Sequence, residues 1–80
     1  MASFYPYLYD AALALCIDAR IKAGLTQAQL AERFGQTERF VASYESGDRL
    51  LDPAECIAIC RAIGVDPYEL LQKAGEEAGN

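Results

Sequence analysis

Apolar residues recur every three or four positions along most of the chain, which is the spacing of helices that bury one face. No stretch alternates apolar and polar residues as a half-buried strand does. Short breaks rich in Gly, Pro, Thr and Asp divide the pattern into five segments. The predicted fold class is therefore all-α, with five helices in one domain over residues 1–80.

The first segment predicts a helix that begins at Pro6, or a residue or two later, and runs to Ala23. Residues 1–7 are either an aromatic N-terminal arm or the start of this helix. The helix carries two apolar stripes, and a domain this small has little to cover the second one. Either the arm folds back over it or it forms part of a homodimer interface, and we favour the interface. Its candidate residues are Leu13, Ile17 and Tyr9.

Two short helices follow in the centre of the chain. Thr26 and Gln29 have the spacing of a capping box that starts one helix, and Gly35 stops it. Thr37 supplies the hydroxyl that caps a second helix, which ends at Gly47. Helices joined by so short a link cross steeply. The apolar residues predicted to face the interior are Leu30, Ala31, Phe34, Phe40, Val41 and Tyr44.

The fourth helix is predicted over residues 53–63, with Asp52 as its cap and Glu55 as the partner in a capping box. Its predicted buried face is Ile57, Cys60 and Ile63, with Cys56 beside them.

The same start signal recurs at Asp66, with Glu69 three residues later. The fifth helix is predicted to run to about Ala74, and residues 75–80 form a frayed polar tail.

The turn signals occur in a recognisable order: AGLTQAQLAERFG, then QTERFV, then YESGDR, then LLDPAECIAICRAIGVDPYELL. From Cys16 to Leu71 the chain closely resembles the Cro and lambda-repressor-like regulators, the xenobiotic-response-element (XRE) type of helix-turn-helix protein. The resemblance implies a compact five-helix DNA-binding domain with the helix-turn-helix at the second and third helices. It also implies a sequence-specific repressor that binds an inverted-repeat operator of double-stranded DNA as a homodimer.

A helix that enters the major groove presents its N-terminal residues to the base edges. The base-reading candidates are therefore Thr37, Glu38, Arg39 and Ser43. Arg39 leads because its planar fork can donate twice to guanine. Glu38 either accepts a hydrogen bond from cytosine N4, or its carboxylate is there only because negative charge is stabilised at the positive, N-terminal end of a helix dipole. Phe40 stands where many relatives carry a small polar residue, and core packing is favoured over a thymine contact.

The candidates for contact with the DNA backbone are Gln27, Gln36, Arg49 and Lys22. In the resembled family the glutamine at the position of Gln27 contacts the backbone or braces the reading helix. Arg20 is expected to pair with Glu45 inside the domain, because the arginine at this position faces inward in proteins of the resembled family.

The net charge of −5 is unusual for a protein that binds DNA through its electrostatic field. Residues 20–49 contain five basic and four acidic residues, a balance of +1, so the rest of the chain carries −6. The acidity supports an alternative function, an interaction module that binds a regulator, a polymerase subunit or a toxin. A DNA-bound form could also contact RNA polymerase through Glu32 or Asp48.

Other classes of function find little support. The chain has no histidine, no glycine-rich phosphate loop and no group of three metal ligands apparent in the sequence, so no enzyme, cofactor or metal site is expected. Cys56 and Cys60 lie on one helix face, but without further ligands core packing is favoured over zinc. With no membrane-spanning run and no signal peptide, the protein is expected in the cytoplasm and, when bound to DNA, in the nucleoid. Its three cysteines are then free thiols.

Overall fold

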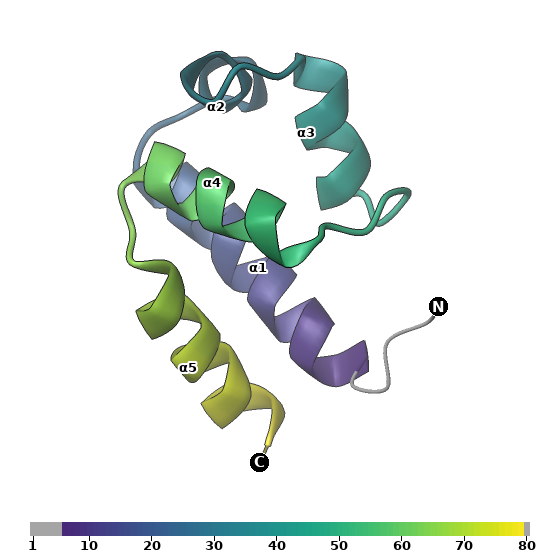
Figure 1. The fold of residues 1–80 in the computed structure, drawn as a ribbon, viewed down its shortest axis with the longest axis vertical. Coiled ribbons are helices and arrows are strands. Elements are labelled where there is room, and N and C mark those ends of the chain that lie inside the picture. The colour runs from purple at the N-terminus through teal and green to yellow at the C-terminus, as the bar shows by residue number, and fades with distance from the viewer. Residues whose placement is uncertain (1–5, 80) are drawn as a thin grey trace.

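The computed structural model describes residues 6–79, and within them all regular structure is helical (Figure 1). The predicted all-α class is confirmed. The predicted arm lies mostly at residues 1–5, outside the described residues. None of the described helices has the length and apolar character needed to cross a bilayer. The helices are α1 (Pro6–Lys22), α2 (Gln27–Arg33), α3 (Glu38–Glu45), α4 (Pro53–Ile63) and α5 (Pro67–Ala78).

The helices form two groups that meet at α4. In Figure 1, α1 runs diagonally through the molecule with α5 packed along its lower half, while α2 and α3 pack on each other at the upper end. Helix α4 contacts α1, α2 and α5. It therefore needs an apolar surface wider than one stripe.

Local hydrogen bonds start the helices where the sequence predicts. The Gln29 backbone N–H donates to the Thr26 hydroxyl at 3.0 Å, and the Gln29 side chain accepts from the Thr26 N–H at 2.9 Å. Asp52 and Glu55 form the same reciprocal pair at 2.7 and 3.0 Å. These two predicted capping boxes are thus confirmed.

Helix α5 differs from its prediction at both ends. Asp66 caps it by accepting from the Tyr68 N–H at 2.8 Å, but within the described residues no reciprocal bond from Glu69 completes a box. The helix then continues to Ala78, so the predicted frayed tail is wrong for residues 75–78. Ala74 is fully buried and Ala78, one turn later, is half-buried. Gly75 lies inside this helix, and the packing of Ala74 and Ala78 offsets the roughly 1 kcal/mol that a glycine within a helix costs.

Two groups of buried residues make the interior. The main core cluster lies between α2, α3 and α4 and consists of Leu30, Ala31, Val41, Tyr44, Ile59 and Ile63. The second cluster joins α1, α4 and α5 through Cys16, Cys60 and Leu70. The inward side of the helix-turn-helix therefore rests on α4.

The buried face of α4 is rotated from the predicted one. Ile59 has no exposed surface, whereas Ile57 is only half-buried and lines a surface cavity. Ile59 and Ile63, one turn apart, reach the main core cluster, while Cys60 faces the second. The sequence pattern suggested one stripe because it did not show that α4 is covered on two sides.

This rotation predicts unequal costs for two similar truncations. Ile59→Ala should lower the free energy of unfolding by about 2 to 5 kcal/mol, because a cavity remains in a closed core. Ile57→Ala should cost less than half as much, since its site already opens to solvent. Urea unfolding followed by circular dichroism would measure both. Equal losses, or a larger loss at Ile57, would contradict the packing described here.

Candidate nucleic-acid interface

A tight turn sets the position of α3 against α2. Gly35 has φ +76°, a left-handed conformation that is cheap only for glycine. The chain then reverses, and the Gln36 N–H donates back to the Ala31 carbonyl at 2.9 Å. The Thr37 hydroxyl accepts from the Phe40 N–H at 3.2 Å and caps α3. In Figure 1, α2 is seen nearly end-on while α3 runs downward, so the predicted steep crossing is present.

A cluster of hydrogen bonds around Glu45 fixes the other end of α3. Arg20 of α1 donates twice to the Glu45 carboxylate, from Nε at 2.7 Å and from Nη2 at 3.0 Å. A third bond, from Arg20 Nη1, reaches the Leu25 carbonyl at 2.8 Å. Gln27 Nε2 also donates to Glu45, at 2.9 Å. The predicted Arg20–Glu45 pair is confirmed, and Gln27 braces α3.

This ion pair is largely removed from water. The exposed fractions of the Arg20 and Glu45 side chains are 13% and 8%. The hydrogen bonds to Glu45 raise the pKa of Arg20 above its ordinary value. Since Glu45 is the last residue of α3, the pair ties the helix-turn-helix to α1.

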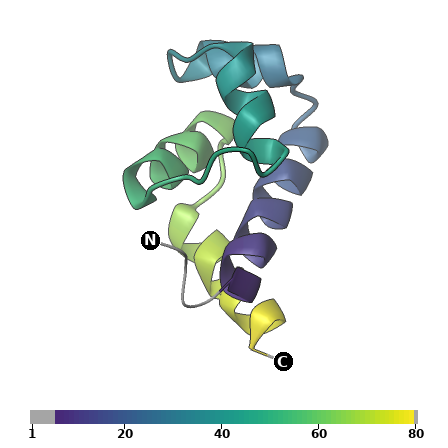
Figure 2. The same ribbon diagram turned by 90° about the vertical axis from the view of Figure 1, so that its right-hand side faces the viewer.

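The outer side of α3 is bare. Figure 2 views the molecule from this side, and no other described helix crosses in front of α3. Thr37, Glu38 and Arg39 are exposed at its start, and Gln36 is exposed in the turn. Ser43 is half-buried, and its carbonyl accepts from the Ser46 hydroxyl at 3.1 Å. Four of the predicted contact residues therefore lie together at one accessible helix end.

Comparison with known proteins agrees with this geometry. A helix-turn-helix family model matches residues 17–70, which include all of α2, α3 and α4. The chain belongs to the XRE-type helix-turn-helix family. A solved structure described as an XRE-family like protein from Pseudomonas syringae pv. tomato str. DC3000 is 44% identical, with a TM-score of 0.84, and the match covers 88% of this chain and 85% of that one. A search of curated proteins found no match. The chain is thus a DNA-binding helix-turn-helix regulator.

Most basic residues near the interface of this XRE-type protein already have an internal partner. Lys22 pairs with Asp18 at 2.9 Å, with both side chains more than half exposed. Arg33 donates to the Ala62 carbonyl of α4 at 3.1 Å. Within residues 6–79, Arg39 is the basic residue of the 20–49 segment that makes no hydrogen bond or ion pair. Its guanidinium is available to an external acceptor.

Arg49 lies between an aromatic ring and a carboxylate. Its guanidinium carbon is 4.5 Å from the centre of the Phe40 ring, and its Nη2 is 2.6 Å from Glu55 Oε2. The paired hydrogen bonds raise the pKa of Arg49 and lower that of Glu55. Phe40 also packs edge-on against Phe34 and Tyr44, which agrees with the predicted packing role.

The predicted dimer residues have contacts inside the XRE-type chain. Leu13 packs on the main core cluster, and the Tyr9 hydroxyl accepts from the Leu51 N–H at 3.1 Å. Ile17 is half-buried. Their role in a dimer stays a prediction, for which Ile17 is now the best test position.

The structure corrects the expectation that no three metal ligands come together. Cys16 of α1 lies opposite Cys56 and Cys60 of α4, and the three sulfur atoms are all within 4.8 Å of one another. The sequence showed only the pair on α4, because the third cysteine is 40 residues away along the chain. The available signal was that Cys16 falls at helical spacing from Leu8, Ala12 and Ala19, a pattern typical of a helix face packed on a core.

The ion pair beneath α3 gives a stability prediction. Glu45→Ala leaves Arg20 largely buried without its partner and should cost about 3 kcal/mol, the low end for a broken buried pair, because both side chains retain some exposure. Glu38→Ala, at the exposed end of the same helix, should change stability by no more than about 0.5 kcal/mol. Urea unfolding of both variants is the measurement. A cost at Glu45 no larger than at Glu38 would show that the pair does not hold α3.

Proposed function

We propose that this protein is a sequence-specific transcriptional repressor that binds an inverted-repeat DNA operator as a homodimer, with α3 in the major groove. The observation that carries the proposal is the exposed start of α3 with the unpaired Arg39. The major groove is wide enough for one helix, and its base edges distinguish all four base pairs. Repression then requires only that the bound protein occlude the polymerase.

Arg39 is the leading base reader. It can donate two hydrogen bonds to guanine without first giving up a protein partner. Thr37 keeps its hydroxyl hydrogen for a base or phosphate, since the cap uses the oxygen only as an acceptor. Glu38 and Ser43 complete the base-reading set, with Ser43 limited by its partial burial.

Contacts with the DNA backbone would come from both sides of α3. Gln36 lies free in the turn, while Arg49 and Lys22 must loosen exposed pairs with Glu55 and Asp18 to bind phosphate. Exposed pairs contribute only about 0 to 1 kcal/mol, so a phosphate can compete for these cations. The Gln27 amide stays on Glu45 and supports α3 indirectly.

A second copy of the chain supplies a second recognition helix and thereby the further base contacts that an operator requires. One reading helix spans too few base pairs to select a genomic site. A two-fold dimer places two such helices about 34 Å apart, one helical turn of DNA, and this spacing calls for an inverted repeat. The exposed carboxylates of Glu32 and Asp48 remain available for contact with RNA polymerase in such a complex.

Arginine substitutions test the assignment of base contacts. Arg39→Ala should weaken operator binding by about 1 to 3 kcal/mol and relax preference at one base pair in each half-site. Arg49→Ala should weaken binding to every sequence alike and reduce the salt slope by about 1. Operators selected from random duplex DNA, then varied base by base in fluorescence titrations, provide the readout.

Arg61→Ala is the matched control, because Arg61 is exposed and lies two residues from Ile59 and Ile63, the α4 residues that pack in the core cluster shared with α3. If the Arg39 variant lost affinity uniformly across sequences, base reading would move to another residue. If the wild-type chain retarded no DNA even at low salt, the acidic interaction module would replace the repressor.

The homodimer is tested on α1. Ile17→Asp places a charge in the proposed interface and should convert a dimer into monomers in sedimentation experiments, with loss of cooperative binding to paired half-sites. Ala14→Asp adds the same charge to an exposed position of the same helix and should leave the dimer intact. A wild-type monomer that binds single half-sites independently would contradict the dimer, and an unaltered Ile17 variant would move the interface elsewhere.

A further inference from the structure

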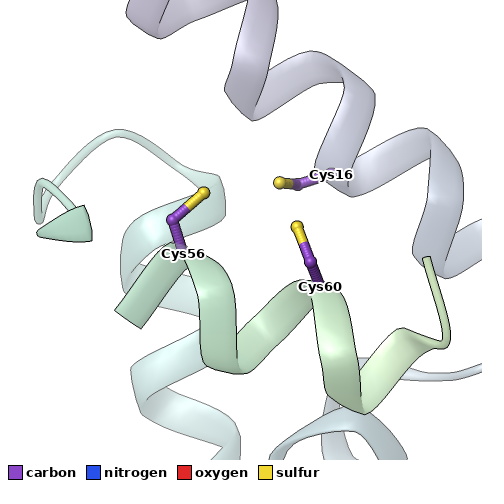
Figure 3. A group of neighbouring side chains, drawn as sticks. All are labelled: Cys16, Cys56 and Cys60. Atoms are coloured by element: carbon purple, nitrogen blue, oxygen red, sulfur yellow. The ribbon is translucent and has the colours of Figure 1, made fainter. Parts of the chain in front are cut away.

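Three cysteine side chains converge where α1 crosses α4. Figure 3 shows the sulfur of Cys16 pointing from α1 into the space between those of Cys56 and Cys60, which stand one turn apart on α4. All three sulfurs lie within 4.8 Å of one another. Three sulfurs spaced evenly around one ion, with bonds of about 2.3 Å, are at most about 4.0 Å apart. Side-chain rotations that draw the sulfurs closer together would therefore place all three on one ion.

The three sulfurs are largely shielded from bulk water, but a surface cavity reaches two of the three cysteines. Cys16 is 2% exposed and Cys60 is fully buried, while Cys56 is only half-buried. A largely apolar cavity of about 310 Å³ is lined by both Cys16 and Cys56 and opens to the surface between α1 and α4. An uncharged small molecule could reach the sulfurs along this path.

The ligand set selects among thiophilic ions by coordination number and charge. No carboxylate of the described residues joins the three sulfurs, and the sequence contains neither a fourth cysteine nor a histidine. Zinc prefers four ligands, and its fourth here would be water in an apolar cavity. Three thiolates leave a net charge of −2 on monovalent copper and −1 on zinc, but none on a trivalent ion. Burying uncompensated charge is costly, so a trivalent ion fits best.

We propose that Cys16, Cys56 and Cys60 form a binding site for a trivalent thiophilic metalloid, with arsenite as the matching ligand. Arsenite enters as the neutral acid As(OH)₃. Three As–O bonds break and three As–S bonds form, each thiol proton leaves with a hydroxide as water, and arsenic keeps its oxidation state. The product is a neutral As(SR)₃ group that links α1 to α4.

Binding to the reduced full chain tests the proposal directly. Native mass spectrometry should show one arsenic per chain with three protons lost, and arsenite should slow the alkylation of all three thiols in the folded chain, followed by mass spectrometry after digestion. Cys56→Ser should weaken arsenite binding by more than about 100-fold, since even the outer partners of metal ligands contribute 10- to 100-fold. Zinc and monovalent copper, titrated in parallel, should bind more weakly than arsenite.

Ile57→Val, which alters the wall of the same cavity but no sulfur, is the control and should bind as wild type does. Circular dichroism checks folding, and Cys56→Ala replaces the serine variant if that one is unfolded. Four results would each overturn the site: arsenite binding unchanged in the Cys56 variant, protection of only one or two thiols, tighter binding of zinc or copper, or closure of two cysteines into a disulfide in place of binding. None of these readouts depends on DNA.

Discussion

The carboxylate of Glu45 joins three helices at one point. It receives hydrogen bonds from Arg20 of α1 and Gln27 of α2, while its own backbone ends α3. Apolar packing holds α3 on α4 but is not directional, so it does not by itself set how far α3 turns about its axis. The charged bonds to Glu45 have fixed geometry and supply that orientation. The direction in which Arg39 points thus depends on a pair of charges at the opposite end of the same helix.

The parts of the fold that depend on neighbouring residues could be predicted from the sequence. The capping boxes at Thr26 and Asp52 use partners three residues away, and both formed where expected. The pattern failed where a distant surface decides burial. Ile59 is in the core because α4 is covered from two sides, and α5 extends to Ala78 because its last turns rest on another helix. Neither surface appears in the local sequence.

The candidate site, too, has parts that local sequence predicts and parts that depend on contacts between distant helices. The position of α3 and the exposure of its first residues followed from turn chemistry and apolar spacing. Which arginine is free did not, because the partners of Arg33 and Arg49 come from α4. The cysteine cluster was missed for a related reason: its third member is contributed by α1, and only the packed helices bring the sulfurs together.

The internal pairing of Arg49 and Lys22 also bears on how a protein of this kind would find its operator. A chain with net charge −5 whose flanking cations are already engaged gains little from phosphates alone. Its stay on unrelated DNA would be short, which favours many brief landings over long one-dimensional sliding. The carboxylates of Glu55 and Asp18 would compete with DNA phosphates for these cations on every sequence, so the protein would leave most sites quickly and stay only where base contacts add to the affinity.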